Sequence, residues 1–174
     1  QHEYALRTHT FNTLVPKLKY FATNPEYFMM NLDGERVDLQ LCPSNPDILP
    51  IAARVTRQIL ANHPDVEYFA LAANDGNWRC HCVPCRTLDK AADPGKHCHH
   101  CFIMHYSSAG SLIHMANRLG EMIEDEFPGV RIMAQAYLSS QRAPINAKIS
   151  DNGFIELCNH MQLLNKPVDW TTSD

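Results

Sequence analysis

The densest group of chemically reactive side chains in this 174-residue sequence is a run of cysteines and histidines between residues 80 and 101. Two Cys-x-x-Cys pairs stand twelve residues apart within it. Each short turn of this kind can deliver two thiolates to one tetrahedral zinc ion, and histidine nitrogens can take their place. The spacing predicts a metal site whose ligands are Cys82, Cys85, Cys98 and Cys101, with Cys80, His97, His99 and His100 as alternates.

The same cysteines have two other interpretations. In an oxidising compartment they would close local disulfides, and they could also remain free thiols. A catalytic zinc ion usually keeps three protein ligands and one open position, whereas this segment offers more soft ligands than one ion needs. We therefore expect a structural zinc ion or disulfides that pin a long loop over the strand ends.

A second group of polar residues, Asn74-Asp75-Gly76-Asn77, directly follows a short apolar run. Sites in parallel α/β folds are built at the carboxyl ends of strands, so Asp75 is a candidate catalytic carboxylate. Glu156, in an otherwise apolar strand, is the candidate second carboxylate, because a carboxylate there needs a partner or a function. The alternatives are plain turn chemistry for Asp75 and a salt bridge at a sheet edge for Glu156.

Four further residues are candidates for substrate binding. His9 follows a short strand and could face the same cleft, although a lone histidine is more often structural. Asn74 and Asn77 lie on either side of Asp75, and Tyr137 lies on a later apolar strand, which also carries the polar residue Gln135.

The elements that must position these side chains alternate between strands and helices. Apolar residues recur at helical spacing from Ile48 to Ile59 and again from Leu112 to Phe127. Expected strands are residues 68–73, 130–138 and 153–158, and a hairpin turns at Asp33-Gly34. This order predicts an α/β fold with a parallel sheet. No glycine-rich nucleotide-binding motif follows any expected strand.

Composition excludes several classes of protein. Fifteen Lys and Arg against nineteen Asp and Glu give a formal charge of −4, which argues against a nucleic-acid partner. No apolar run approaches the roughly 18 residues that span a bilayer. The first residues do not resemble a signal peptide, and a start at Gln1 suggests a processed product or a piece of a longer chain.

The order of short motifs along the chain resembles an uncharacterised domain family of secreted proteins. The barrel of that family is similar to those of alpha-glucuronidases and beta-hexosaminidases, which are glycoside hydrolases. The matching motifs are His9-Thr10-Phe11, Pro25-Glu26-Tyr27-Phe28, Gln40-Leu41-Cys42, Asn74-Asp75-Gly76, Cys80-x-Cys82-x-x-Cys85, Ala116-Asn117-Arg118, Phe127-Pro128, Ala136-Tyr137 and Leu157-Cys158.

The resemblance implies a TIM-type (β/α)8 barrel, of which this chain would supply roughly the third to sixth βα units. Residues 1–174 would form a single domain, and residues 78–106 a Cys/His-rich loop inserted within it. The hexosaminidase relatives carry an Asp-Glu pair after the equivalent strand, whereas Gly76 follows Asp75 here. The acetamido-assisted mechanism is therefore not carried over.

The sequence thus predicts a carbohydrate-active protein, secreted or periplasmic, that binds a glycan at the carboxyl ends of its strands. If it is an enzyme, it is a glycoside hydrolase that uses Asp75 and Glu156. The alternative is a non-enzymatic extracellular binding or assembly module, whose exposed strand edges pair with other copies or with the remainder of a longer chain.

Overall fold

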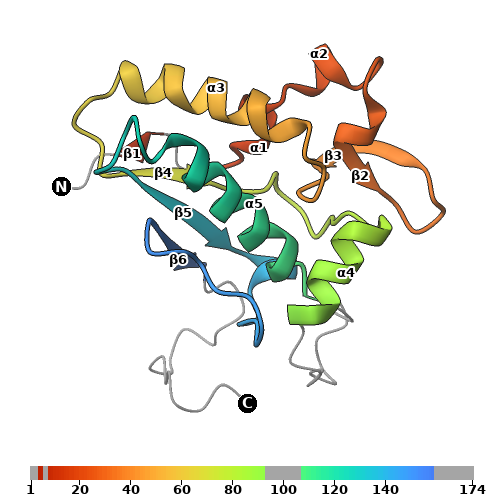
Figure 1. Ribbon diagram of the computed structural model, residues 1–174. Coiled ribbons are helices and arrows are strands. Elements are labelled where there is room, and N and C mark those ends of the chain that lie inside the picture. The colour runs from red at the N-terminus through yellow and green to blue at the C-terminus, as the bar shows by residue number, and fades with distance from the viewer. Residues whose placement is uncertain (1–3, 6–7, 93–106, 159–174) are drawn as a thin grey trace, which may run out of the picture.

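A parallel sheet lies at the centre of the computed structural model, which describes residues 4–5, 8–92 and 107–158 (Figure 1). All neighbouring strands in this sheet run parallel. Its strands, in spatial order, are β1 (Tyr4–Ala5), β4 (Tyr68–Leu71), β5 (Arg131–Ala136) and β6 (Gly153–Leu157).

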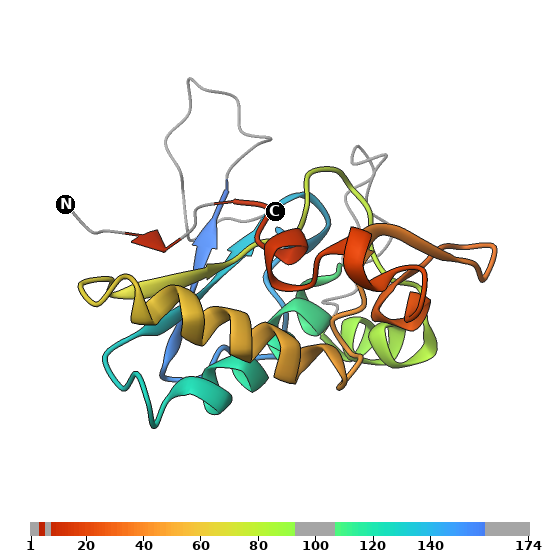
Figure 2. The same ribbon diagram turned by 90° about the horizontal axis from the view of Figure 1, so that it is seen from above.

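Two long helices cover one face of this sheet, α3 (Ile48–Ala61) and α5 (Ala109–Ile123) (Figure 2). Phe69, Ile132 and Ala134 are fully or almost fully buried in the main hydrophobic core with the apolar stripes of these helices. The remaining helices are shorter: α1 (Phe11–Leu14), α2 (Lys17–Tyr20), α4 (Val83–Ala92) and the 3-10 turns η1 (Pro25–Tyr27) and η2 (Leu138–Ser140).

An antiparallel hairpin, β2 (Phe28–Met30) and β3 (Arg36–Leu41), forms a second, separate sheet. Its turn closes where the Asn31 N–H donates to the Glu35 carbonyl, 2.8 Å away. Gly34 adopts a φ of +86°, a left-handed conformation that costs glycine little. The hairpin lies beside α4 at one end of the molecule (Figure 1).

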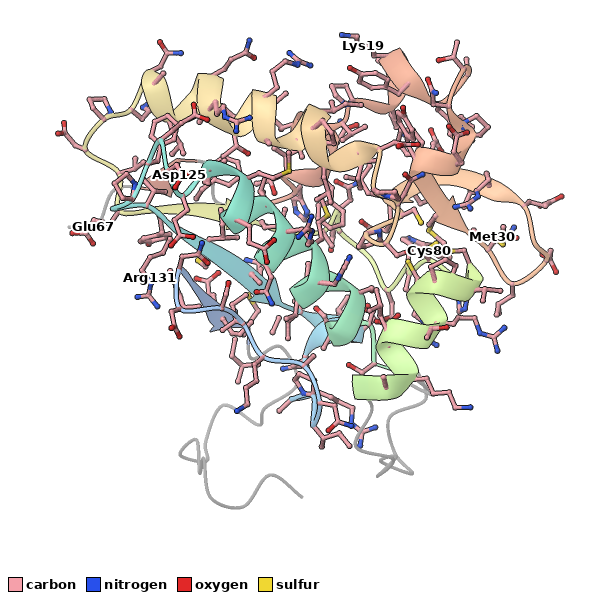
Figure 3. All side chains as sticks on the ribbon, viewed as in Figure 1. Lys19, Met30, Glu67, Cys80, Asp125 and Arg131 are labelled. Atoms are coloured by element: carbon pink, nitrogen blue, oxygen red, sulfur yellow. The ribbon has the colours of Figure 1, made fainter. Side chains whose placement is uncertain are left out.

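The carboxyl ends of the central strands point toward that same end. Glu67 precedes β4 and Arg131 opens β5, and both lie at the opposite end of the molecule from Cys80 (Figure 3). The segment after β4 therefore carries the chain from the sheet directly to the hairpin and α4.

The α/β class, the parallel sheet, the hairpin and the two long helices confirm the sequence predictions. The expected strand at residues 68–73 ends earlier, at Leu71, because Ala72 bonds to Thr10 and Phe11 at the start of α1 instead. The Phe11 N–H donates to the Ala72 carbonyl, and the Ala72 N–H donates to Thr10 Oγ1.

Two other features differ from expectation. Residues 83–92, part of the expected Cys/His-rich loop at 78–106, form helix α4. The connection from β5 to β6 contains only the 3-10 turn η2, although parallel strands are usually joined by an α-helix. Within the described residues the sheet is open, with β1 and β6 at its edges, so a closed barrel is not formed.

Among the helices of the described residues, none combines the length and the apolar character needed to cross a membrane.

Candidate metal centre and adjoining pocket

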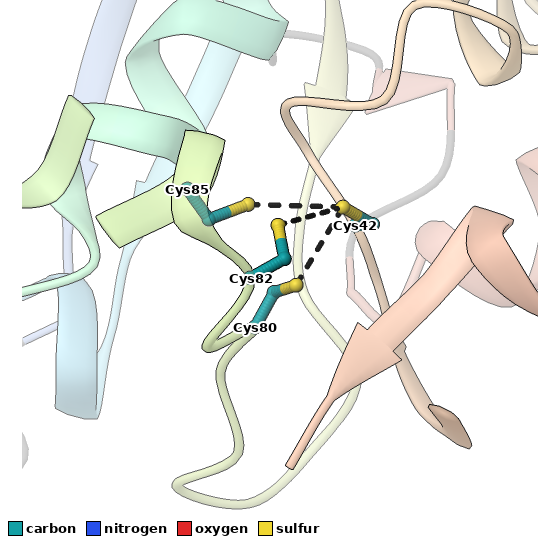
Figure 4. A group of neighbouring side chains, drawn as sticks. All are labelled: Cys42, Cys80, Cys82 and Cys85. Carbon is teal, nitrogen blue, oxygen red and sulfur yellow. Dashed lines mark hydrogen bonds between the residues drawn. The ribbon is translucent and has the colours of Figure 1, made fainter. Parts of the chain in front are cut away.

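Four buried cysteines meet where the hairpin contacts the segment that follows β4 (Figure 4). Cys42 Sγ lies 3.5 Å from Cys80 Sγ and 3.5 Å from Cys82 Sγ. It lies 3.8 Å from Cys85 Sγ, and all four sulfur atoms are within 4.8 Å of one another. These cysteines are free thiols, whereas two bonded sulfurs stand about 2.05 Å apart.

The sulfur spacing fits a single tetrahedral metal ion. Zinc binds thiolate sulfur at about 2.3 Å, so sulfurs at the corners of the tetrahedron stand about 3.8 Å apart. The distances from Cys42, 3.5 to 3.8 Å, are close to that edge length. An iron–sulfur cluster would need space between the cysteines for several irons and sulfides. The four cysteines, the cysteine cluster below, could therefore hold one thiophilic metal ion.

Two segments distant in the sequence supply the cysteine cluster. Cys42 directly follows β3, Cys80 and Cys82 belong to the connection after β4, and Cys85 stands in the first turn of α4. The Arg86 N–H donates to the Cys82 carbonyl at 3.0 Å, which closes the first turn of α4. This turn brings Cys82 and Cys85 to the same side of the backbone, facing Cys42 (Figure 4).

Strand β2 holds Cys80 in place from the other side. The Met30 N–H donates to Cys80 Sγ at 3.3 Å, and the His81 N–H donates to the Met30 carbonyl at 2.8 Å. The Arg36 guanidinium donates to the Phe28 carbonyl at 2.6 Å and lies 4.0 Å from Cys80 Sγ. A cation and an N–H donor beside a thiolate partly offset the negative charge of a metal–thiolate site.

Ser44 is a further partner of the cysteine cluster. Its Oγ lies 3.0 Å from Cys85 Sγ, 3.6 Å from Cys42 Sγ and 3.7 Å from Cys82 Sγ. One hydroxyl therefore contacts three of the four sulfurs. Hydrogen bonds of this kind orient metal ligands and tune their basicity.

The thiols do not ionise alike. The hydrogen bond from the Cys80 thiol lowers the pKa of Cys42 to about 6. Hydrogen bonds from Cys42, Cys80 and Cys85 likewise lower the pKa of Cys82, whereas the pKa values of Cys80 and Cys85 are raised, chiefly by their bonds to Cys42. Cysteine binds a metal as the thiolate, so a cation that binds here displaces the protons that the thiols still carry.

A pocket adjoins the cysteine cluster and opens at the carboxyl ends of β3, β4 and β5. Cys80 belongs to both, because it also lines the pocket. The remaining polar lining consists mostly of side-chain amides, hydroxyls, one guanidinium and two aromatic side chains with polar atoms. The lining residues are Phe11, Gln40, Leu41, Pro43, Ala73, Asn74, Gly76, Trp78, Arg79, Cys80, Ser108, Ser111, Leu112, Gln135, Tyr137, Ser139 and Ser140.

Gln40 fixes the wall of this pocket at Asn74. The Gln40 Nε2 donates to the Asn74 carbonyl at 2.6 Å, while Gln40 Oε1 accepts the Asn74 N–H at 2.9 Å. The Asn74 side chain in turn donates to the Leu39 carbonyl at 2.9 Å. Because Gln40 is only 2% exposed, these bonds replace water for both groups and join the end of β3 to the end of β4.

The predicted carboxylates lie near the pocket but are not among its lining residues. Asp75 is exposed between two lining residues, and its Oδ1 accepts the Gly76 N–H at 2.8 Å. Glu156 is half-buried on the edge strand β6 and accepts a hydrogen bond of 3.1 Å from Gln135, which lines the pocket. Within the described residues the pocket wall contains no carboxylate.

The predicted substrate-binding residues are brought to the same end of the sheet. Asn74 and Tyr137 both line the pocket. His9 is exposed, with a φ of +56°, and its Nδ1 lies 3.2 Å from the Ala73 carbonyl. Asn77 is half-buried in the connection after β4 and does not line the pocket.

The ligand set of the cysteine cluster differs from the set that spacing predicted. Cys82 and Cys85 are in the cluster, together with Cys80, which was an alternate. The other predicted ligands and alternates, Cys98, Cys101, His97, His99 and His100, lie outside the described residues. Cys42 takes part although spacing gave no reason to include it, because it is 38 residues from Cys80 in the sequence.

Other contributors to the site were also missed. Trp78, Arg79 and Gln135 line the pocket, yet only Gln135 had drawn attention, as a polar residue in a strand. The signal that could have found Trp78 is its place between the predicted strand end at Asn74 and the first cysteine of the run. Aromatic residues in such connections are exposed more often than those within strands.

These features define an α/β protein with a four-cysteine cluster beside a pocket at the carboxyl ends of parallel strands. The family described as "Domain of unknown function (DUF4838)" matches residues 1–174, and the chain belongs to this family. Neither the curated proteins nor the solved structures gave a match. The expectation of an uncharacterised domain family is thereby confirmed, and its likeness to alpha-glucuronidases stays a prediction.

Proposed function

We propose that this protein binds a glycan in the pocket at the carboxyl ends of β4 and β5. The observation that carries the proposal is the pairing of aromatic side chains, Trp78 and Tyr137, with the side-chain amides Gln40 and Gln135 in one pocket wall. Ligand pockets combine apolar and aromatic surface with a few placed polar groups. A sugar ring matches that combination, because its C–H face packs on an aromatic ring and its hydroxyls bond to amides.

Glycoside hydrolysis is the reaction we propose if the protein is an enzyme, with Asp75 and Glu156 as its carboxylates. Hydrolases of this type use two carboxyl groups roughly 5 to 9.5 Å apart across the scissile bond. The position of Asp75 between two pocket residues supports a role at the rim, and the bond from Gln135 to Glu156 links the second carboxylate to the wall. A bound glycan would have to reach both groups.

We further propose that the metal ion of the cysteine cluster is structural zinc. Four protein thiolates leave no open position for a substrate, which is the pattern of structural zinc sites. A two-stranded hairpin is marginally stable by itself, and the hydrophobic cluster beneath β2 and β3 consists mainly of Met29 and the four cysteines. A metal ion there would join the hairpin to the connection after β4 and so brace the pocket wall.

The sheet supports a proposal about the larger fold. All-parallel sheets occur almost only with both faces covered, yet α3 and α5 lie on the same face. We propose that this sheet is part of a TIM-type barrel, roughly its third to sixth βα units, whose remaining strands belong to a longer secreted or periplasmic protein.

A second candidate function, a non-enzymatic assembly module, is favoured by the edge strand β6. Ile155 and Leu157 on this strand are 41% and 38% exposed, and its outer edge pairs with no strand of the described residues. Unpaired edges recruit other strands unless they are covered. Sedimentation of the native protein would show a homo-oligomer if copies pair through β6, and Ile155→Lys would then dissociate it.

Glycan binding is tested by titrating the purified protein with defined oligosaccharides of β-linked glucose, xylose and N-acetylglucosamine in a calorimeter. Binding that is lost in Tyr137→Ala and kept in the exposed α3 variant Gln58→Ala supports the proposal. No heat with any oligosaccharide class would contradict it. Asp75→Asn distinguishes a hydrolase from a binding module. A hydrolase should lose glycoside turnover but keep glycan binding, whereas a binding module should keep its glycan affinity and has no turnover to lose.

Metal content is tested by native mass spectrometry. We expect one zinc ion per chain in the wild type and in Cys158→Ser, since Cys158 is a free cysteine outside the cluster. Cys42→Ser should lose the ion or bind it far more weakly. A mass for one iron in place of zinc would correct the metal, and a metal-free wild type that takes up no added zinc would refute the site.

A further inference from the structure

Trp78 is the most exposed aromatic side chain among the pocket residues. It is 53% exposed, in the connection between β4 and the cysteine cluster. Its indole ring lies directly over Gly76. A Cβ atom added at Gly76 would lie 2.6 Å from Trp78 Nε1 and 2.7 Å from Trp78 Cδ1, both too close for contact. Gly76 also has a φ of +107°, where side chains are strained.

The other end of the same short segment is held by the cysteine cluster. Cys80 follows Trp78 by two residues, is 5% exposed and contacts Cys42 through sulfur. Met30 donates its N–H to Cys80 Sγ, so strand β2 holds the same position. The indole of Trp78 is therefore packed against Gly76, which permits its close approach, and lies two residues before Cys80, which could be a metal ligand.

We propose that the metal ion at the cysteine cluster controls the position of Trp78, and that Trp78 is the residue on which the ligand of the pocket stacks. The proposal that a ligand stacks on Trp78 rests on the glycan-binding function proposed above. The proposal that the metal ion controls Trp78 rests on the connection from Trp78 through Cys80 to the cysteine cluster. Without a metal ion, the contacts that the described residues make with Cys80 Sγ are those of other thiols, the Met30 N–H at 3.3 Å and the Arg36 guanidinium at 4.0 Å. Thiols are weak hydrogen-bond donors and acceptors, so the segment loosens.

Linkage between the two sites must be reciprocal. If metal binding orders Trp78 and so strengthens glycan binding, the glycan must strengthen metal binding by the same factor. We expect a factor of roughly tenfold, the scale of one well-packed aromatic contact.

The exposed indole also indicates the class of ligand. A neutral pyranose ring would present an apolar face to Trp78 and hydroxyls to the amides of the pocket wall.

The linkage is measured through the fluorescence of Trp78. The sequence contains two tryptophans, so Trp170→Phe leaves Trp78 as the sole indole fluorophore. In this background we expect acrylamide to quench Trp78 less after zinc is added than after zinc is removed by a chelator. Adding Cys42→Ser should abolish the zinc effect, whereas adding Cys158→Ser should keep it. Equal quenching with and without zinc would overturn the proposal.

A pair of glycine variants tests how Trp78 is held. Gly76→Ala should displace the indole, raise its quenching in the zinc-loaded protein and weaken oligosaccharide binding by roughly tenfold. Gly34→Ala is the matched control, because Gly34 also has a positive φ but nothing lies within 4 Å of an added Cβ. If Gly76→Ala leaves quenching unchanged, the indole does not depend on Gly76 and the positioning argument is wrong.

The two proposals can fail separately. Zinc-dependent quenching without binding of any oligosaccharide would refute the glycan function and the stacking role while it upheld the control of Trp78 by the metal. Oligosaccharide binding that is unchanged by Trp78→Ala would refute the stacking role alone. Binding that is lost in Trp78→Ala but unaffected by zinc removal would refute the linkage.

Discussion

The Asp89 side chain on α4 accepts a hydrogen bond of 2.8 Å from the backbone N–H of Ser111 in the first turn of α5. The first N–H groups of a helix have no partner within the helix, and a carboxylate is a favourable one. Ser108, the N-cap residue of α5, makes no side-chain cap of its own. Asp89 thus caps α5 from a neighbouring helix, four residues after a cysteine of the cluster, and joins α4 to the pocket wall at Ser111.

The first prediction concerns the pH dependence of this cap. Burial raises the pKa of Asp89 from 3.8 to about 6, although the bond from the Ser111 N–H opposes the rise. The folded protein therefore binds this proton more tightly than the unfolded chain does. The stability that protonation contributes is present at low pH and is lost as the pH rises from about 4 through 6.

Asp89→Asn keeps an oxygen acceptor for Ser111 but cannot ionise. Its free energy of unfolding in urea, relative to the wild type, should therefore rise between pH 4.5 and pH 7.5 by about 2 kcal/mol. Asp89→Ala removes the cap and should cost about 1 kcal/mol at low pH. A constant difference between Asp89→Asn and the wild type over this range would contradict the shifted pKa.

The second prediction concerns Ser44. Removing the hydroxyl that contacts three sulfurs, in Ser44→Ala, should weaken zinc binding by about tenfold without removing a ligand. Competition with a chromophoric chelator measures this affinity. Thr87→Ala is the matched control, since its hydroxyl donates to the Val83 carbonyl on the exposed side of α4. Equal losses in both variants would mean that Ser44 acts on stability and not on the cysteine cluster.

The third prediction concerns removal of the metal. Chelation should lower the midpoint of thermal unfolding, because binding to the folded state alone adds stability by mass action. Amide hydrogen exchange should rise first in the hairpin β2–β3 and in the connection after β4. The amides of β5, which are bonded on both sides within the sheet, should keep their protection. Uniform loss of protection would show that the metal supports the whole fold instead of this one junction.

Cobalt replacement is a companion measurement to metal removal. Co2+ at a tetrahedral four-thiolate site gives intense visible absorption that an octahedral site lacks. We expect this absorption from the wild type and Cys158→Ser, and its loss from Cys42→Ser. Absorption that persists in Cys42→Ser would show that another residue completes the site.

The fourth prediction concerns Gln40, whose side chain bonds both the N–H and the carbonyl of Asn74. Gln40→Ala leaves two polar groups without these partners near the end of β4, and should cost about 2 to 3 kcal/mol in unfolding free energy. Gln58→Ala on the exposed face of α3 should cost much less. Because Gln40 also lines the pocket, ligand affinity should fall with stability. A cost no greater than that of Gln58→Ala would mean that water replaces both bonds.

The sequence by itself determined the local elements. Helical spacing of apolar residues marked α3 and α5, and the Asp33-Gly34 dipeptide marked the hairpin turn, because these signals depend on residues that are near neighbours in the chain. Spacing also indicated Cys82 and Cys85 as metal ligands, since one short turn brings both to the same point. Helix α4 was missed because its ten residues stand within a run of cysteines, histidines and prolines typical of a loop.

Only the tertiary structure decided which distant residues meet. Cys42 joins the cluster because the hairpin returns the end of β3 to the connection after β4, and no spacing rule reports a contact over 38 residues. The indole of Trp78 lies over Gly76 because that residue has a positive φ and no Cβ to block the ring. Such contacts depend on how packed elements are oriented, which the order of residues along one element does not specify.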